Sequence, residues 1–230
     1  MIQLKQVTKK YGLKTALKDI DLHLEKGKII GLIGENGSGK STTLKLIAGL
    51  TSPSSGTVHV FEQPVSRRIA SHVSFLSDED MFYSYMTVKD VLDFYQGQFN
   101  DFNRSKAEDM LVFMELTLTD KVKKLSKGNR GRLKIVLALS RDVPIVVMDE
   151  PLSGLDPLVR DSIMKSLVSF VDLEKQLILI TTHEIKEFEM ILDEVILIKN
   201  GQIIGHESVD TIREQEGTDI VGWMKKRYVE

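Results

Sequence analysis

The sequence has no cysteine, and this absence excludes several kinds of chemistry at once. Disulfide bonds, thiolate-bound zinc, iron–sulfur clusters and cysteine nucleophiles all need that residue, and nothing else in the sequence points to secretion. An excess of one charge is also missing, since 31 Lys and Arg balance 33 Asp and Glu to a formal net charge of −2. A near-neutral chain has no overall attraction to polyanions, so we expect no nucleic-acid partner.

Long hydrophobic runs are missing as well. None approaches the roughly 18–20 apolar residues that a membrane-spanning helix requires, and the basic first ten residues lack the apolar core of a signal peptide. The 230 residues are 42% hydrophobic and 28% charged, which suits one globular domain of ordinary composition. We therefore expect a soluble chain that stays in the cytoplasm.

Strand and helix patterns alternate along most of the chain. Apolar and polar residues alternate in 2–7 and 20–24, as in half-buried strands, whereas the apolar runs 145–148 and 177–180 are typical of buried parallel strands. Asn200-Gly201 lies between two further strand patterns and predicts a hairpin turn.

Residues 87–124 have a different pattern, with apolar residues at helical spacing and Thr87 and Asp90 as a predicted helix start. We predict an α/β fold with a mostly parallel central sheet, an antiparallel β portion at the N-terminus and an inserted α-helical subdomain. Within one domain of residues 1–230, we expect 1–78 and 141–206 to form the core and 79–140 the helical subdomain. A short helix and a tail are expected in 207–230.

The most specific local signal is a glycine-rich loop between a predicted strand and a predicted helix. Its sequence, Gly34-Glu35-Asn36-Gly37-Ser38-Gly39-Lys40-Ser41, fits the pattern G-x-x-x-x-G-K-[ST]. Glycines let the backbone curl so that its N–H groups surround phosphate oxygens, and the following helix points its positive dipole end at the same anion. We expect Lys40 to contact the β- and γ-phosphates of a nucleoside triphosphate and Ser41 to bind Mg²⁺.

A pair of carboxylates supplies the second half of this site. Asp149 ends the apolar run 145–148, at the carboxyl edge of a predicted strand, where ligands bind in open α/β sheets. We expect Asp149 to hold Mg²⁺, directly or through water, and the adjacent Glu150 to polarise an attacking water molecule.

The order of these motifs resembles that of the ATP-binding subunit of an ABC transporter, and the resemblance covers nearly the whole chain. The glycine-rich loop is similar to the Walker A motif, 145–149 to Walker B, and Glu150 to the catalytic glutamate. The resemblance implies a P-loop NTPase fold of the ABC ATPase type that binds ATP and Mg²⁺. It also implies nucleotide contacts from Asn36, Gly37, Ser38, Gly39, Lys40, Ser41 and Thr42.

Further motifs extend the resemblance. Residues 125–129 are similar to the family signature, which implies that Ser126 and Gly128 contact ATP held by a second subunit. Asp156 lies in a segment similar to the D-loop, Tyr11 stands where an aromatic ring stacks on adenine, and His183 stands where a histidine senses the γ-phosphate. Considered alone, Ser126 predicts only a helix cap, and Tyr11 is either a ring that stacks on adenine or a surface aromatic.

Two segments depart from the family pattern. Asp78 stands where the Q-loop has glutamine; an aspartate there still reaches Mg²⁺ or water, so we include it among the catalytic and metal-binding candidates. In the signature, Lys127 and Asn129 replace the usual glycine and glutamine, which is similar to bacterial exporters of the drug and peptide type.

The resemblance implies a Mg²⁺-dependent ATPase that drives membrane transport. Its implied partners are multi-span permease subunits and a second nucleotide-binding domain, a copy of itself or a paralogue, at the cytoplasmic face of the membrane. Its implied cargo is a drug, a peptide or a lipid-like molecule for export. Two alternatives stay open: a soluble ABC-type ATPase acting on a ribosome, nucleic-acid or iron–sulfur assembly complex, and a module that binds ATP without hydrolysing it.

Overall fold

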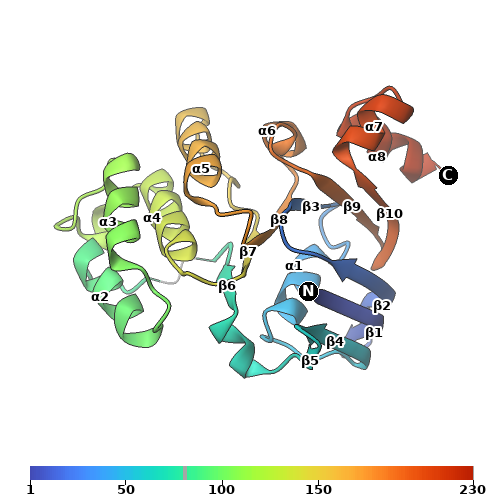
Figure 1. Ribbon diagram of the computed structural model, residues 1–230, viewed down its shortest axis with the longest axis horizontal. Coiled ribbons are helices and arrows are strands. Elements are labelled where there is room, and N and C mark those ends of the chain that lie inside the picture. The colour runs from blue at the N-terminus through green and yellow to red at the C-terminus, as the bar shows by residue number, and fades with distance from the viewer. Residues whose placement is uncertain (80–81, 230) are drawn as a thin grey trace.

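The computed structural model describes residues 1–79 and 82–229 and has the predicted α/β architecture (Figure 1). Its strands, within these residues, form two sheets. The first has the order β2 (Lys14–Leu24), β1 (Ile2–Tyr11), β4 (Ser55–Val60) and β5 (Gln63–Pro64). The second has the order β10 (Gln202–Ser208), β9 (Glu194–Lys199), β3 (Ile29–Ile33), β8 (Leu177–Thr182), β7 (Ile145–Asp149) and β6 (Val73–Leu76).

The first sheet is antiparallel, as the alternating N-terminal pattern predicts. Ile2 pairs with Leu24 and Leu4 with Leu22, and all four side chains are buried. Because successive side chains of a strand point to opposite faces, the polar residues between them face away from this apolar layer. Helix α1 (Lys40–Ile47) packs its buried Leu44 into the same hydrophobic cluster.

The second sheet is parallel except where β10 pairs with β9, so the prediction of a mostly parallel central sheet is confirmed. Its two faces pack against different layers. Ile30 and Leu32 join the cluster that contains the antiparallel sheet and α1, whereas Ile29 and Ile33 join the cluster that contains the remaining helices. The predicted turn between β9 and β10 has positive φ angles at Asn200 (50°) and Gly201 (78°), as a two-residue hairpin requires.

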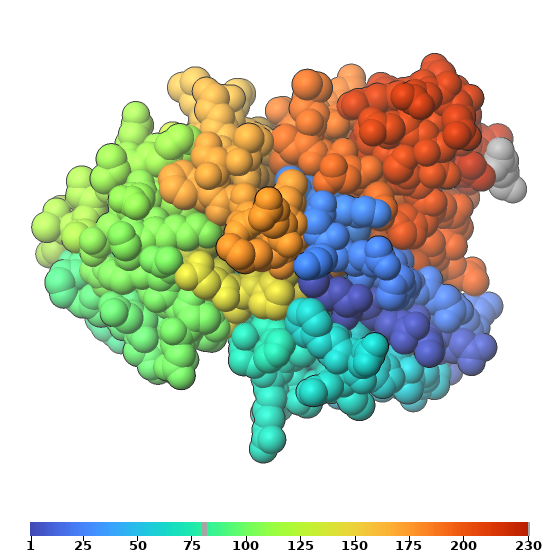
Figure 2. Space-filling view, viewed as in Figure 1, coloured from blue at the N-terminus to red at the C-terminus, as the bar shows by residue number. Residues whose placement is uncertain are grey.

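The predicted helical segment lies at one end of the molecule, and the C-terminal helices lie at the other (Figure 2). The helical segment consists of α2 (Val88–Gln98), α3 (Arg104–Phe113), the short η2 (Val122–Lys124) and α4 (Lys127–Leu139). A further short helix, η1 (Arg67–Ser71), lies outside this segment and precedes β6. The capping box predicted from Thr87 and Asp90 is present: the Thr87 hydroxyl accepts from Asp90 N–H at 3.2 Å, and the Asp90 carboxylate accepts from Thr87 N–H at 2.8 Å.

The C-terminal part differs from the expected short helix and tail. After α5 (Pro157–Phe170) and α6 (Ile185–Phe188), the chain forms α7 (Val209–Gln215) and then α8 (Ile220–Val229). Ile212, Ile220 and Trp223 are fully buried, and this burial stabilises two helices where one was expected. No helix among the described residues is long and apolar enough to cross a membrane.

Candidate functional site

The carboxyl ends of three parallel strands meet at one edge of the central sheet. Ile33 at the end of β3 pairs with Thr182 of β8, and Asp149 at the end of β7 pairs with Thr181 of β8. The loops that leave these strands are therefore neighbours, and they carry the glycine-rich loop, Glu150 and His183. This edge is the usual ligand position in open α/β sheets.

The glycine-rich loop is closely surrounded on its outer side. Gly34 and Gly39 have left-handed φ angles of 151° and 117°. A Cβ atom would lie 2.2 Å from the Ile198 carbonyl oxygen at position 34, and 2.5 Å from a Leu17 methyl group at position 39. Only glycine satisfies both conditions, so this packing explains why glycine stands at these two positions of the loop that leads into α1.

Lys40 lies inside the curve of this loop. Its side chain is buried, and its Nζ donates to the carbonyl oxygens of Gly34 at 2.8 Å and Glu35 at 3.2 Å. The same Nζ lies 3.7 Å from Oε1 of Glu150. The ammonium group is thus held by the loop's own backbone at the place where phosphate oxygens would be received.

Ser41 and Asp149 supply hard oxygen atoms next to Lys40. The Ser41 hydroxyl donates to Asp149 Oδ1 at 3.0 Å, and the Thr181 hydroxyl donates to the same oxygen at 2.7 Å. Mg²⁺ prefers one or two protein oxygens together with phosphate oxygens and water. The donor set therefore fits Mg²⁺.

Glu150 is fixed in an unusual backbone conformation beside the metal-binding candidates. Its φ angle is +49°, a strained value for a residue with a side chain. Its N–H donates to the Thr181 hydroxyl at 3.0 Å and to the Thr181 carbonyl oxygen at 3.1 Å. Thr181 therefore binds the Asp149 carboxylate and fixes the Glu150 backbone, a role that the sequence analysis did not assign although Thr181 lies only two positions before His183.

His183 is paired with Glu150 in this structure. Oε2 of Glu150 accepts from the His183 N–H at 3.1 Å and lies 2.6 Å from the ring Nδ1. An ionised carboxylate only accepts hydrogen bonds, so the ring carries a proton on Nδ1. His183 is about half exposed, at 48% of its side-chain surface, and its Nε2 faces away from Glu150 toward Glu184 at 3.7 Å.

The signature and D-loop candidates form a second group. Ser126 caps α4, its hydroxyl accepting from Asn129 N–H at 3.1 Å, and Asp156 caps α5 by accepting from Val159 N–H at 3.1 Å. A Cβ atom on the buried Gly128 would lie 2.8 Å from a Val159 methyl group. Within residues 1–79 and 82–229, no hydrogen bond joins Ser126, Gly128 or Asp156 to the glycine-rich loop.

Lys127 and Asp78, the departures from the family pattern, line a cavity of about 340 Å³ together with Glu150. The Lys127 ammonium lies against the D-loop, where a Cβ atom on Gly154 would be 2.1 Å from it. Asp78 is exposed, and its backbone carbonyl oxygen accepts from Lys134 Nζ at 2.8 Å. The catalytic and metal-binding roles of Asp78 stay predictions.

Tyr11 lies at the end of β1 with 48% of its surface exposed. Lys9 Nζ lies 4.8 Å from the centroid of its ring. The hairpin of β1 and β2 adjoins the glycine-rich loop through Leu17 and Ala16, which contact Gly39. The contact of Tyr11 with adenine stays a prediction.

Comparison with known proteins identifies the family. A family model described as "ABC transporter" matches residues 17–153, more than half of the chain, including the glycine-rich loop, Asp149 and Glu150. The chain belongs to the ABC transporter family. It is an ATP-binding subunit of that family, and the predicted ABC ATPase fold is confirmed.

Named relatives extend over almost the whole of this ABC ATPase. The "Nod factor export ATP-binding protein I" of Cupriavidus pinatubonensis is 32% identical over 96% of the chain and 70% of its own length. The uncharacterised ABC transporter ATP-binding protein YxlF of Bacillus subtilis is 29% identical over 99% of the chain and 80% of its own length.

A solved structure links the fold to hydrolysis products. The ATP-binding cassette MJ0796, described as a dimer in a post-hydrolysis state bound to ADP and Pi, superposes with a TM-score of 0.79 at 25% identity. The superposition covers 90% of this chain and 98% of MJ0796. The likeness is consistent with ATP hydrolysis and with pairing to a second nucleotide-binding domain.

Proposed function

We propose that this ABC ATPase is the ATP-hydrolysing motor of a membrane exporter, and that the glycine-rich loop and the carboxylates beside it are its catalytic half-site. The observation that carries the proposal is the convergence of Lys40, the Ser41–Asp149 pair and the Glu150–His183 pair at one sheet edge. Each supplies a function that phosphoryl transfer needs: charge for the phosphates, oxygens for Mg²⁺ and a base for water.

ATP binding begins at the loop. The N–H groups of 36–42 surround the phosphates, and Lys40 leaves part of its contact with Gly34 and Glu35 to reach the β- and γ-phosphates. Ser41 and Asp149 would hold Mg²⁺, and a bound Mg²⁺ would supply positive charge against the phosphates. Tyr11 stacks on the adenine from the neighbouring hairpin.

Glu150 orients the attacking water and takes its proton. The Thr181 hydrogen bonds and the strained φ angle fix the Glu150 backbone at one position, so its carboxylate points to the γ-phosphate side of Lys40. His183 holds that carboxylate through Nδ1. The other ring nitrogen, Nε2, is the proposed contact to the γ-phosphate, so the pair acts as one unit.

A second copy of the chain, or a paralogue, completes each site. Ser126 and Gly128 lie at the N-terminus of α4, where backbone N–H groups and the helix dipole favour an anion. They form no hydrogen bond to the loop within the described chain, so we assign them, with Asp156, to the γ-phosphate side of the partner's ATP. The dimeric MJ0796 cassette supports this arrangement.

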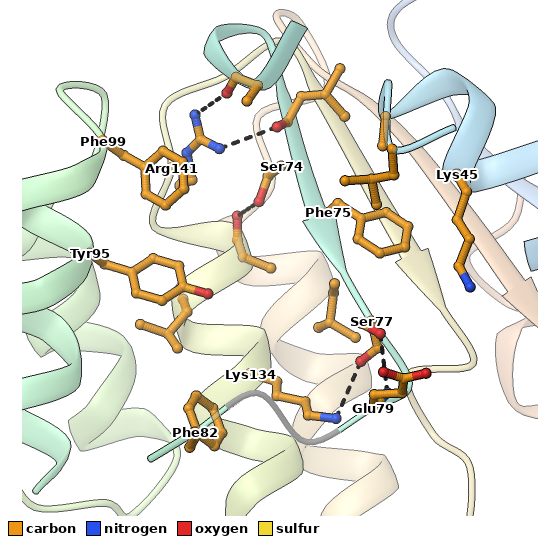
Figure 3. A pocket seen from close by; sticks show the side chains of 17 residues that line it. Lys45, Ser74, Phe75, Ser77, Glu79, Phe82, Tyr95, Phe99, Lys134 and Arg141 are labelled. Carbon is orange, nitrogen blue, oxygen red and sulfur yellow. Dashed lines mark hydrogen bonds between the residues drawn. The ribbon is translucent and has the colours of Figure 1, made fainter. Parts of the chain in front are cut away.

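A groove of about 390 Å³ between β6, α2 and α4 is the proposed seat of a cytoplasmic segment of the membrane subunit (Figure 3). Phe75 of β6 and Tyr95 of α2 line it on opposite sides of the β6 strand, and Phe82 lines it near Lys134. The apolar lining suits side chains of a short helix or loop, and Lys45 and Glu79 provide charges at its edge.

The groove is connected to the catalytic half-site. Lys134 of α4 donates to the carbonyl oxygens of Ser77 at 3.2 Å and Asp78 at 2.8 Å, and Asp78 shares the neighbouring cavity with Glu150. A segment that moves in the groove therefore shifts the residues that lead to Glu150. The export direction rests on the similarity to the Nod factor export protein and on the signature residues 125–129.

The test is recovery of the tagged chain from detergent-solubilised membranes of its source cell. We expect a multi-span membrane protein in near-stoichiometric amount. Phe82→Glu, in the groove, should lose it, whereas Phe61→Glu, a partly exposed phenylalanine on the antiparallel sheet, should retain it. Recovery of soluble partners alone, or equal recovery by both variants, would contradict the proposed membrane partner or its seat.

A further inference from the structure

The outer side of the glycine-rich loop is held by the C-terminal third of the chain. The N–H of Gly201, in the β9–β10 turn, donates to the carbonyl oxygen of Ser38 at 2.9 Å. The N–H of Glu35 donates to the side-chain hydroxyl of Tyr228 at 3.2 Å. The second bond joins two residues that lie 193 positions apart in the sequence. Together the two bonds hold the loop on the side opposite to its phosphate-binding face.

Tyr228 is itself fixed in place. Lys199 Nζ donates to the backbone carbonyl oxygen of Tyr228 at 2.8 Å, and the same ammonium lies 4.9 Å from the centroid of the tyrosine ring. The rest of α8 is anchored by Trp223, which is buried against Gly205 of β10, where a Cβ atom would lie 2.7 Å from the indole. Figure 1 shows α8 beside α7 and β10 at this end of the molecule.

The Tyr228 hydroxyl is protonated at neutral pH and free to accept from an N–H. Burial raises the pKa of Tyr228, and the hydrogen bond from Glu35 works in the opposite direction without cancelling that rise. The Tyr228 ring is half-buried between Lys199 and the loop. Its hydroxyl oxygen is therefore an ordered acceptor for the Glu35 N–H, in the place of a water molecule.

Glu35 connects this brace to the catalytic lysine. Its N–H is bound by Tyr228, and its carbonyl oxygen accepts from Lys40 Nζ at 3.2 Å. Lys40 also donates to Gly34, so both carbonyl groups that hold the ammonium lie next to the peptide N–H that Tyr228 fixes. A rotation of the Glu35 peptide groups would displace Lys40 from its position in the loop.

We propose that Tyr228 is a positioning residue of the ATP site: its hydroxyl fixes Glu35 and thereby prepares the loop and Lys40 for the phosphates. The proposal rests on the proposed function of the loop as the ATP half-site. Tyr228 touches neither nucleotide nor water in this role, and the residues from 207 onward carried no functional assignment from the sequence.

The experiment is isothermal titration of the purified chain with Mg–ATP and with Mg–ADP, together with steady-state hydrolysis. Tyr228→Phe keeps the ring and removes the hydroxyl. Loss of one neutral hydrogen bond corresponds to about a 2- to 10-fold weaker Kd, and we expect this for both nucleotides. We expect kcat at saturating ATP to stay within about 2-fold, because Glu150 and His183 are untouched.

Tyr85→Phe is the matched control, since Tyr85 is exposed and lies just before α2 in the helical segment, with no part in the proposed site. It should leave both Kd values unchanged. Lys199→Met removes the ammonium that holds Tyr228, so it should also weaken nucleotide binding. The double variant Tyr228→Phe, Lys199→Met should lose no more binding free energy than the two single variants lose together.

An unchanged Kd in Tyr228→Phe would overturn the proposal, even if the melting temperature fell, because a purely structural role moves only stability. If Tyr228→Phe does not fold, Lys199→Met decides by the same criterion. Failure of the wild-type chain to bind Mg–ATP at all would instead refute the proposed function of the loop.

Discussion

Replacing Glu150 by glutamine isolates the proposed base from the rest of the half-site. Glutamine has the same size and retains an oxygen acceptor, but its amide cannot take a proton from water. In the structure the Glu150 carboxylate accepts two hydrogen bonds from His183 and lies 3.7 Å from Lys40 Nζ. The substitution therefore removes a negative charge and one acceptor without emptying the space.

The cost to stability is small enough to leave a folded protein. A hydrogen bond to a charged group contributes about 1.5–3 kcal/mol, and half of the His183 surface is exposed, so the loss lies at or below the lower end of that range. A domain of ordinary stability, about 5–15 kcal/mol, tolerates it. A change in turnover then reports on chemistry.

We expect Glu150→Gln to reduce phosphate release by about 10²- to 10⁴-fold, the usual contribution of a positioned base. We expect its affinity for Mg–ATP to equal or exceed that of the wild type, because a negative charge near the γ-phosphate has been removed. The assays are phosphate release at saturating ATP and isothermal titration, with size-exclusion chromatography to detect an ATP-bound dimer.

Glu184→Gln is the matched control. Glu184 also lies near His183, at 3.7 Å from Nε2, but its carboxylate bonds to Arg160 at 2.6 Å. It should retain turnover within a few-fold. Turnover close to wild type in Glu150→Gln would refute the assignment of Glu150 as the base.

Two further outcomes test separate parts of the account. Ser126→Ala should lose about 1 kcal/mol of stability with its helix cap, and its turnover should fall at least 10-fold while its Kd for ATP stays unchanged. The control Asn103→Ala, which removes the cap of α3, should lose similar stability and keep its turnover. An equal loss of turnover in both variants would contradict the composite site. Burial acts to raise the pKa of Glu194, but hydrogen bonds from Lys28 and His206 hold it below its usual value. The stability that the ionised Glu194 carboxylate contributes is present at neutral pH and is lost as pH falls through the lowered pKa. Glu194→Gln should therefore be less stable than wild type by about 1 kcal/mol at pH 7, and urea unfolding should show this difference disappearing below about pH 4. A difference that stays the same at every pH would refute the linkage.

Much of the half-site was predictable because its signals lie within single segments. The glycine-rich loop carries its own spacing, Asp149 ends an apolar run, and Asn200-Gly201 marks a turn by residue type alone. The comparison with the structure confirms the fold that these segments predicted. Each of these signals depends on neighbours in the sequence, which pattern analysis can read.

Other features depend on pairs of residues far apart in the chain. Thr181 orients Asp149 and Glu150 only because parallel strands place their carboxyl ends side by side. Tyr228 reaches Glu35 only because Trp223 anchors a helix on β10. Ile220, Trp223 and Met224 recur at helical spacing, but their pattern does not show that the helix packs on β10.

The central claim is that the active site is shared between two chains, and the specific ATPase activity as a function of chain concentration tests it most directly. At saturating Mg–ATP, the rate per chain should rise in proportion to concentration when the chain is dilute and reach a plateau when dimers dominate. A rate per chain that is constant at every concentration, with the protein monomeric throughout, would contradict the composite site.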